Sequence, residues 1–184
     1  MGSDWEKLSN ELVGDFKIFE LRRERFRSPR TDGVVNAVVL EARDWVNVIG
    51  LTPEQDVVLI EQFRFGTGEK TLEIPGGIVD PGEEAMQAAA RELREETGYV
   101  ASRWTPLGTV STNPAFMTNR MHTFLAEDCE LRHDQEQDPG EDIAVLLRPL
   151  ADMDRMLATG EIHHALVAIA FQKLRLHREG LAPR

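Results

Sequence analysis

The sequence predicts an α/β protein in which a mixed β-sheet is flanked by helices. Short segments rich in Val, Ile and aromatic residues fill the first half of the chain, with gaps of turn length between them, as is typical of antiparallel strands. The first convincing helical segment lies near the middle of the chain. Further strand-like runs follow it, and two helical segments come last. This order of elements is typical of a mixed sheet with flanking helices.

The strand-like segments give the expected order of the sheet. Strands are expected over residues 15–26, 34–41, 44–51, 56–65 and 70–74, the last of which runs into Pro75-Gly76-Gly77. Further strands are expected at 105–109, 121–125 and 142–148, and helices at 151–158, which stops at Gly160, and at 162–177.

The central helix is expected over residues 83–97. Asp80 suits the N-cap, Pro81 suits the first helical position, and Glu83 stands where a capping box would place its carboxylate. Gly98 is the type of residue that ends helices in the left-handed conformation. The sequence therefore predicts both ends of this helix.

The net charge of −11 is concentrated in two windows of the 184-residue chain. Residues 77–100 hold six acids and two bases, which leaves four negative charges, and residues 127–142 hold eight acids and one base, which leaves seven. These two windows account for the whole excess. Charge that is so localised indicates a local purpose.

The remaining composition excludes several classes of protein. A hydrophobic fraction of 41% and a charged fraction of 29% are typical of one soluble globular domain. An acidic chain argues against nucleic-acid or membrane partners. The single Cys129 excludes an internal disulfide and a multi-cysteine zinc site. No apolar run is long enough for a membrane span and no signal-peptide pattern is present, so we expect a cytoplasmic protein.

The central helix carries three glutamates within five residues. Glu92 and Glu96 are four residues apart and therefore share a face, and Glu95 lies nearby. The helical wheel predicts an apolar stripe that faces the core and is formed by Met86, Ala90, Leu93 and Thr97, with the Glu92–Glu96 face at its border. On this wheel Arg91 and Arg94 point elsewhere. A solvated polar face is one interpretation.

A bound cation is the other interpretation, because the glutamates repel one another unless something cationic lies among them. Mg²⁺ prefers oxygen ligands and suits two or three carboxylates together with a substrate phosphate. The glycines at 76 and 77 would let the backbone come close to such a ligand. The sequence therefore predicts a divalent-metal site.

The full spacing in this region resembles the signature of a known family. The pattern Gly77-x5-Glu83-x7-Arg91-Glu92-Leu93-x-Glu95-Glu96-x-Gly98-Tyr99 is similar to the Nudix box of hydrolases that act on a nucleoside diphosphate linked to another group. Tyr99 stands where the pattern favours an aliphatic residue. The resemblance implies an α/β/α sandwich with a mixed central β-sheet.

The same resemblance implies roles for individual residues. Glu92 and Glu96 would be the main ligands of Mg²⁺ or Mn²⁺, with Glu95 and the carbonyl group of Gly76 assisting. Glu83 and Arg91 would be partly structural, and Arg91 would orient a carboxylate by hydrogen bonds.

Segments outside the box are similar to the branch that hydrolyses ADP-ribose and nucleoside diphosphate sugars. The runs 61–65 and 72–77 carry Arg64 and Glu73 at the positions that contact substrate in that branch. The branch also has a proline past the box, matched by Pro114, but a Ser-Pro-Gly form is replaced here by Asn-Pro-Ala-Phe. This departure favours a broader nucleotide-sugar preference. Phe116 would either stack on a base or fill the core.

The second acidic window matches the branch's loop that supplies the catalytic base. Glu141 is the first candidate to activate the attacking water, Glu136 is the alternate, and Asp138 is third. A solvated acidic loop is the other interpretation. His163 and His164 are adjacent, so on a helix they point about 100° apart, and we interpret them as surface or interface residues rather than a metal pair.

We therefore expect a metal-dependent hydrolase that cleaves the pyrophosphate bond of ADP-ribose or another nucleoside diphosphate sugar to a nucleoside monophosphate and a sugar phosphate. Residues 34–184 would form the hydrolase domain, and the strand region 1–33 would help to form a homodimer, as in this branch. The alternatives are a catalytically weak sensor of ADP-ribose-like ligands and a housecleaning hydrolase of other nucleotides.

Overall fold

The computed structural model describes residues 4–137, 140 and 142–181, and the chain divides into two compact units. One unit holds the residues up to Asp44 together with Ser111–Arg120. The other unit holds Trp45–Val110 and the residues from Met121 onward. The predicted boundary between residues 33 and 34 stays a prediction.

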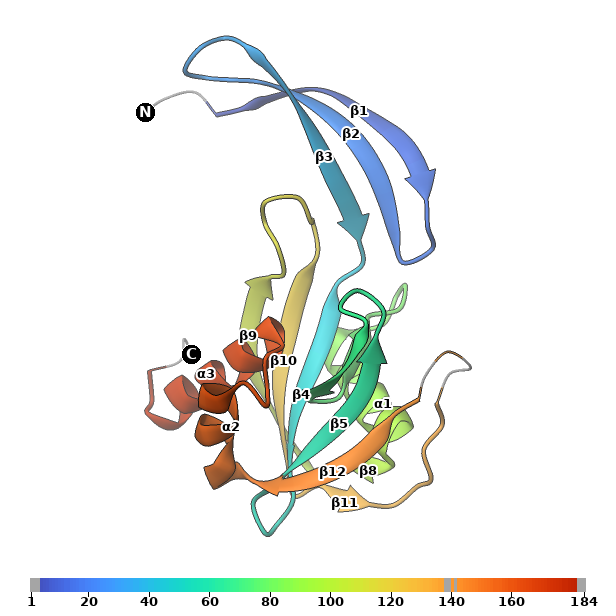
Figure 1. Cartoon of the computed structure of the whole chain (residues 1–184), viewed down its shortest axis with the longest axis vertical. Coiled ribbons are helices and arrows are strands. Elements are labelled where there is room, and N and C mark those ends of the chain that lie inside the picture. Colours follow the sequence, from blue (N-terminus) through green and yellow to red (C-terminus); the bar gives the residue numbers. More distant parts are fainter. Residues whose placement is uncertain (1–3, 138–139, 141, 182–184) are drawn as a thin grey trace. The chain divides into compact units, whose positions relative to one another are not determined.

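The first unit is built on a three-stranded antiparallel sheet, shown in blue in Figure 1. Its strands are β1 (Glu6–Asp15), β2 (Phe19–Arg27) and β3 (Val34–Ala42). The predicted strand over residues 15–26 is confirmed as β2 from Phe19 onward, but its predicted start was wrong. The chain turns between β1 and β2, where Lys17 has a φ of 66°, and an additional strand precedes the turn.

The second unit contains a seven-stranded mixed sheet. Its order is β12-β5-β4-β10-β9, with β6 paired to β5 and β7 paired to β4. The pairing of β10 with β4 is parallel, whereas β4 pairs antiparallel with β5 and β7. The strands are β4 (Trp45–Leu51), β5 (Asp56–Arg64), β6 (Glu69–Glu73), β7 (Gly76–Ile78), β9 (Arg103–Ser111), β10 (Arg120–Glu127) and β12 (Ala144–Pro149), and β8 (Tyr99–Val100) pairs separately with β11 (Glu130–Leu131).

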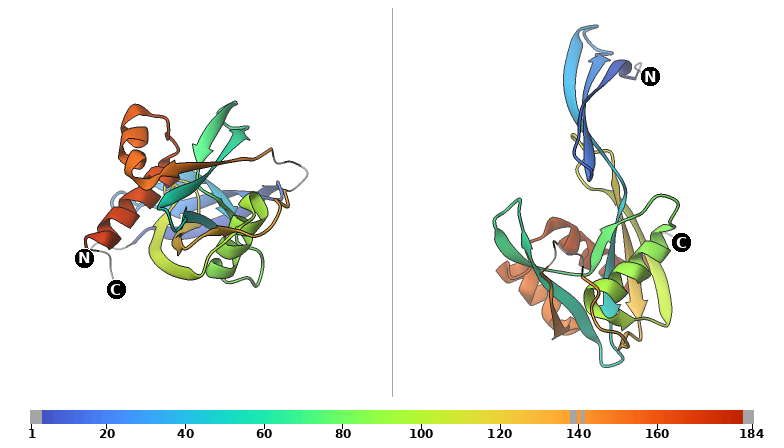
Figure 2. Two further views of the ribbon diagram at one scale, coloured as in Figure 1. Left: turned by 90° about the horizontal axis from the view of Figure 1, so that it is seen from below. Right: turned by 90° about the vertical axis from the view of Figure 1, so that its right-hand side faces the viewer.

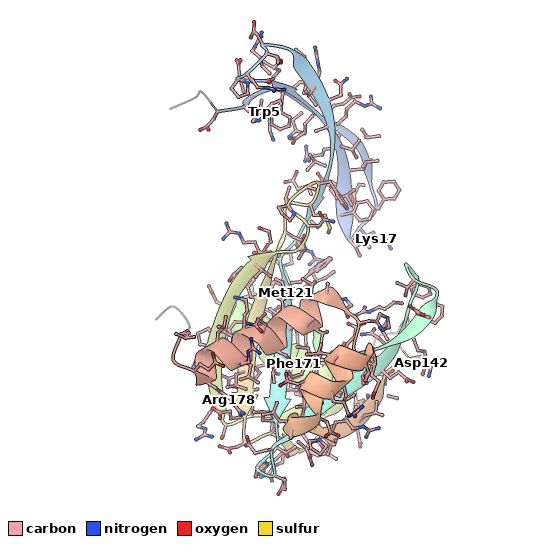
Figure 3. The ribbon with its side chains drawn as sticks, turned by 60° about the vertical axis from the view of Figure 1, so that its left-hand side comes forward. Trp5, Lys17, Met121, Asp142, Phe171 and Arg178 are labelled. Atoms are coloured by element: carbon pink, nitrogen blue, oxygen red, sulfur yellow. The ribbon has the colours of Figure 1, made fainter. Side chains whose placement is uncertain are left out.

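Helices cover both faces of this sheet, as the right-hand view of Figure 2 shows. Helix α1 (Ala85–Thr97) packs through Ala88, Ala89 and Leu93 on the face that carries Val46, Val48 and Val58. On the other face lie a short 3₁₀ turn (Leu150–Asp152), α2 (Met153–Thr159) and α3 (Ala165–Arg178); Phe171 of α3 is labelled in Figure 3. The buried residues of that face include Ile49, Leu51, Val57, Leu59, Met156, Val167 and Leu174. The predicted α/β/α sandwich with a mixed sheet is confirmed.

The start of α1 differs from the prediction. Its N-cap is Glu84 rather than Asp80, and the backbone N–H of Glu84 donates to the side chain of Gln87 at 3.2 Å. Gly82 has a φ of 83°, a left-handed conformation that cannot continue a helix, so the helix begins after it. The predicted end is correct, because Gly98 is left-handed and its N–H donates to the carbonyl oxygen of Arg94.

The buried stripe of α1 agrees with the prediction at Leu93 and Thr97 but not at Met86. Met86 is 51% exposed, whereas Ala88, Ala89 and Glu96 are buried. The helix turns its small residues toward the sheet, and this places one of the glutamates on the inner face.

No helix among the described residues is long and apolar enough to cross a lipid bilayer.

Candidate functional site

The short strand β7 runs between β4 and α1 and leaves no room for a side chain at Gly76 or Gly77. A Cβ atom on Gly76 would lie 2.2 Å from the carbonyl oxygen of Val46, and one on Gly77 would lie 2.3 Å from Oε1 of Glu92. The backbone N–H of Gly76 donates to Oε2 of Glu96 at 2.8 Å. The glycine pair therefore lets the main chain lie directly against the glutamates of α1.

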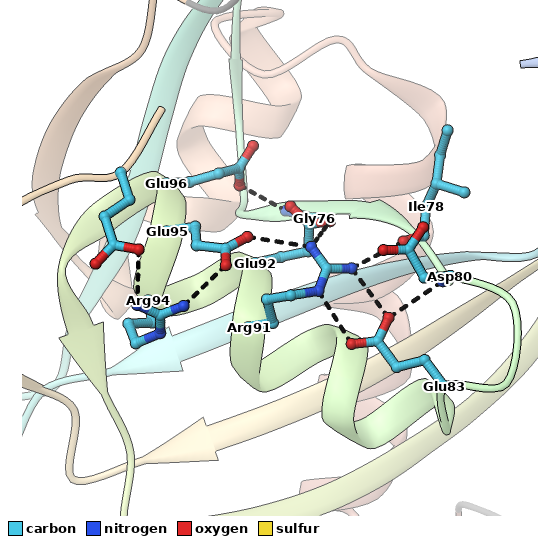
Figure 4. A network of polar contacts seen from close by, with 10 residues as sticks. Gly76, Ile78, Asp80, Glu83, Arg91, Glu92, Arg94, Glu95 and Glu96 are labelled. Atoms are coloured by element: carbon cyan, nitrogen blue, oxygen red, sulfur yellow. Dashed lines mark hydrogen bonds and ion pairs between the residues drawn. The ribbon is translucent and has the colours of Figure 1, made fainter. Parts of the chain in front are cut away.

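Arg91 joins the acidic side chains around this strand (Figure 4). Its Nε and Nη2 atoms donate to the two carboxylate oxygens of Glu83, each at 3.0 Å, and Nη2 also donates to the carbonyl oxygen of Ile78 at 3.1 Å. Its Nη1 atom donates to Glu92 at 2.8 Å and to Glu95 at 3.2 Å. These contacts, led by the hydrogen bond to Glu83, raise the pKa of the guanidinium, and Arg91 holds the pKa of the Glu83 carboxyl below its usual range.

The prediction that Arg91 and Arg94 point away from the glutamates was wrong. Arg94 donates to Glu95 at 2.8 Å, so two guanidinium groups bind that carboxylate. A wheel places only the base of each side chain, and these long side chains fold along the helix surface toward the acids. Part of the expected repulsion is therefore relieved from within the protein.

The residues at this site fit a hard divalent cation. Glu92, Glu95, Glu96 and the carbonyl group of Gly76 are all oxygen donors, which is the ligand chemistry that Mg²⁺ and Mn²⁺ prefer. Glu96 is 3% exposed, and the side chain of Glu92 is 13% exposed. Within the described ranges no group of three acidic, histidine or cysteine side chains is already arranged around a metal position. Instead, Arg91 donates hydrogen bonds to the carboxylates of Glu92 and Glu95, and Arg94 donates to that of Glu95.

Arg64 and Glu73 form a second polar cluster at the neighbouring strands β5 and β6. Arg64 donates to Glu73 through Nε at 2.6 Å and through Nη2 at 2.7 Å, and the hydroxyl group of Thr71 donates to the same carboxylate. Burial would raise the pKa of the Glu73 carboxyl, but the hydrogen bonds from Arg64 and Thr71 together hold it below its usual range. The arginine is thus fixed by a buried carboxylate three residues before Gly76.

The acidic segment after β11 is tied to the end of α1. The backbone N–H of Glu136 donates to the carbonyl oxygen of Glu95 at 2.8 Å, and the Glu136 side chain binds Arg94 at 3.0 Å. Gln135 donates to the carbonyl oxygen of Glu96 at 2.5 Å, and Gln137 exchanges two hydrogen bonds with the main chain of Ile143. The predicted bases Glu141 and Asp138 lie outside the described residues.

The remaining predicted residues lie apart from these clusters or are placed differently. Phe116 belongs to the first unit and is 41% exposed, and its role in substrate binding stays a prediction. His163 is partly exposed and lies 3.5 Å from Glu69. His164 is more than a surface residue, because its Nε2 atom lies 3.8 Å from Oε2 of Glu73.

Sequence reasoning missed Thr71, Gln135, Gln137 and the contact of His164. Each depends on a partner that is distant along the chain or in another strand, and none belongs to a recognisable spacing. A local signal for Thr71 exists in retrospect, since alternate residues of a strand share a face and it stands two before Glu73.

The chain matches known proteins over most of its length. The family model described as the NUDIX domain matches residues 42–168. The chain is 36% identical to an ADP-ribose pyrophosphatase of Bacillus subtilis (strain 168) over 92% of this chain and 91% of that protein. It is 32% identical to an ADP-ribose pyrophosphatase of Mycobacterium tuberculosis over 91% of this chain and 81% of that protein. A solved structure of an ADP compounds hydrolase superposes with a TM-score of 0.81 at 25% identity and 98% coverage of both chains.

Gly77→Ala should weaken metal binding while the fold persists. The added Cβ atom would collide with the Glu92 carboxylate at 2.3 Å, so this side chain must move from its position beside β7. Titration of Mn²⁺ against the protein should show roughly tenfold weaker binding or worse, comparable to the loss of an orienting partner. Gly66→Ala is the matched control, because a Cβ atom there meets nothing within 4 Å. Equal metal affinity in the two variants would contradict this assignment.

Glu73→Gln should destabilise the protein at neutral pH and matter less in acid. The carboxyl pKa is depressed from 4.5, so its contribution is present above that value and is lost as the pH falls through the lower, folded-state pKa. We expect the free energy of unfolding to fall by about 1–2 kcal/mol at about pH 7. The loss is modest because Arg64 is partly solvated and water screens its charge. Urea unfolding at about pH 7 and about pH 3 measures this difference, with Glu69→Gln as the surface control. A difference that is constant with pH would contradict the role of the ionised carboxylate.

Proposed function

The chain belongs to the NUDIX domain family, and we propose that it hydrolyses the pyrophosphate bond of ADP-ribose or another nucleoside diphosphate sugar. The products are a nucleoside monophosphate and a sugar phosphate. The recognition of the Nudix box and of its ADP-ribose pyrophosphatase branch is confirmed by the family match and by the relatives. The assignment as a pyrophosphohydrolase follows from the same matches.

One structural observation carries the proposal. Glu92, Glu95 and Glu96 line α1 at the point where the Gly76–Gly77 backbone reaches the helix. Arg91 joins Glu92 and Glu95 to Glu83, and the backbone N–H of Gly76 donates to Glu96. A pure ligand sensor has no need to hold these carboxylates together beside the β7 main chain. The arrangement therefore supports hydrolysis over sensing.

ADP-ribose pyrophosphatases of this family use divalent metal ions, and we take the ion to be Mg²⁺ or Mn²⁺. Glu92 and Glu96 would hold it, with Glu95 and the carbonyl group of Gly76 as further ligands. When bound, such an ion neutralises charge on the diphosphate and lowers the pKa of a coordinated water.

The other residues orient these groups and the substrate. Arg91 keeps the Glu92 carboxylate beside β7, and Glu83 in turn fixes Arg91 by two hydrogen bonds. Arg64 would contact the substrate, and Glu73 pre-organises its guanidinium in one orientation. A fixed guanidinium loses less conformational entropy on binding an anion than a mobile one does.

We take Glu141 as the general base that removes a proton from the attacking water, with Glu136 as the alternate and Asp138 as the third candidate. Glu136 is engaged by Arg94 on the side of α1, and this supports Glu141 as the first choice. The preceding segment is held against α1 by Gln135, so the acidic stretch begins beside the carboxylates.

We also infer a cytoplasmic homodimer formed with the help of the region 1–33. Its sheet exposes an unusual number of large apolar side chains for a surface, which is typical of an interface. These residues are Trp5, Leu12, Val13, Phe16 and Ile18, and the adjoining β3 adds Val34, Val35 and Val38. Sedimentation equilibrium of the intact chain tests the dimer, and a monomer at all concentrations would contradict it.

Purified protein with Mg²⁺ should release a nucleoside monophosphate from ADP-ribose or from another nucleoside diphosphate sugar in a substrate panel. Glu96→Gln should lower kcat by roughly 10²-fold or more, because a buried metal ligand is lost. Substrate affinity should also fall sharply when the metal is chelated. Tight substrate binding without turnover, unaffected by chelator, would favour the sensor.

Glu141→Gln should lower kcat strongly with little change in KM, because an amide cannot accept the proton of water. Glu136→Gln serves as the comparison, since its side chain has a structural partner in Arg94. Steady-state kinetics at saturating metal separate the two variants. A larger loss in Glu136→Gln would move the base to that residue.

A further inference from the structure

His164 is a partly buried side chain to which the proposed mechanism gives no task. It forms the N-cap of α3, where its carbonyl oxygen accepts hydrogen bonds from the amides of Val167 and Ala168, each at 3.0 Å. The backbone therefore fixes the point from which the imidazole extends. The side chain is 31% exposed, and it lies beside the buried carboxylate of Glu73.

The imidazole and Arg64 approach the same oxygen atom of Glu73. Arg64 donates to Oε2 through Nη2 at 2.7 Å, and Nε2 of His164 lies 3.8 Å from that atom. The other oxygen, Oε1, accepts hydrogen bonds from Nε of Arg64 and from Thr71. Oε2 is therefore the position at which a second cation would compete with Arg64.

We propose that His164 is a positioning residue that makes substrate binding sensitive to acid, because its protonated form competes with Arg64 for Glu73. The inference rests on the proposed role of Arg64 as a substrate contact. With a neutral imidazole, the carboxylate holds the guanidinium by both oxygens. An imidazolium draws Oε2 toward itself, and the bidentate pair that orients Arg64 loosens.

The surroundings of the imidazole keep it neutral at neutral pH. Burial is the largest effect and lowers its pKa from 6.5; Arg64 on β5 and the adjacent His163 lower it further, whereas Glu73 on β6 raises it. His163 is itself paired with Glu69 on β6. The N-terminus of α3 also disfavours a cation. Nδ1 is buried and has no hydrogen-bond partner among the described residues, so a proton there would be unsatisfied.

The two adjacent histidines provide a matched experiment. KM and kcat for ADP-ribose are measured at saturating Mg²⁺ from about pH 7.5 to about pH 5, the lower end of the range in which histidines titrate, because burial lowers the pKa of His164. The proteins are the wild type, His164→Gln and, as the control, His163→Gln. Gln retains a neutral donor near the position of Nε2 and cannot become charged.

KM of the wild type and of His163→Gln should rise roughly three- to tenfold toward acid, as expected for a charge introduced at this distance. KM of His164→Gln should stay level. The fall of kcat toward acid should be the same in all three proteins, because it reports the base and the metal ligands. A KM that rises equally in His164→Gln, or one that is level in the wild type, would overturn the inference.

A second variant separates the loss of the imidazole from a folding defect in His164→Gln. His164→Asn can also cap α3, because Asn is among the preferred N-cap residues, and it should show the same level KM. Thermal unfolding establishes that each variant is folded. If the wild type turned over no nucleoside diphosphate sugar at any pH, the proposed function would fail and this inference with it. If the enzyme is active but KM rises toward acid in both His164 variants as it does in the wild type, the inference alone is overturned.

Discussion

The close approach of the β7 backbone to β4 and α1 determines the rest of the site. It requires glycine at 76 and 77, because a Cβ atom at either would overlap the Val46 carbonyl or the Glu92 carboxylate. The helix packs closely on the same sheet through the small residues Ala88 and Ala89, which lie in one buried cluster with Val46 and Val48 of β4. Once the helix lies this close, Glu96 is buried against a main-chain N–H group instead of water. A buried carboxylate is tolerated only with such partners, so the same contact that packs the helix also fixes the Glu96 carboxylate, which we propose as a metal ligand.

Part of the acidity of the chain is balanced by local ion pairs in the described residues. Arg91 lies among three carboxylates and a carbonyl group, and Arg94 joins Glu95 to Glu136. The first acidic window therefore carries its own counter-ions, and the second is attached to it through one of them. A divalent ion with the same carboxylates as ligands would change these arginine contacts, because each oxygen has a limited number of partners. We therefore expect the arginines to set how strongly the carboxylates attract the ion, besides orienting them.

The sequence was sufficient for most of the fold and for the family, because strand composition and the fixed spacing of the Nudix box are local properties. The metal-ligand roles of Glu92, Glu95 and Glu96 stay predictions. The sequence was insufficient wherever a partner lies far along the chain. The strand Glu6–Asp15 is largely polar and is mostly exposed in a sheet, so alternation gave no signal for it. The left-handed Gly82 moved the helix start, and the buried face took Ala88 and Ala89 in place of Met86. The partners of Gln135, Gln137 and His164 arise only from tertiary structure.

The Arg64–Glu73 pair, which we propose as a substrate contact, and Gly76, a proposed metal ligand, are joined by one short piece of backbone. From Glu73 the chain passes through Ile74, which is 3% exposed in the core, and Pro75, whose carbonyl oxygen accepts the N–H of Val48 at 2.8 Å, and then reaches Gly76. Proline restricts φ, and the two flanking contacts restrict the rest, so this segment is held at every residue. A change in the contacts of the Glu73 carboxylate therefore reaches Arg64 through the Glu73 side chain, which can move. The backbone of residues 74–76 stays in place. Under the proposed roles of Arg64 and of the glutamates of α1, His164 would therefore act on substrate affinity without displacing the groups that carry out hydrolysis.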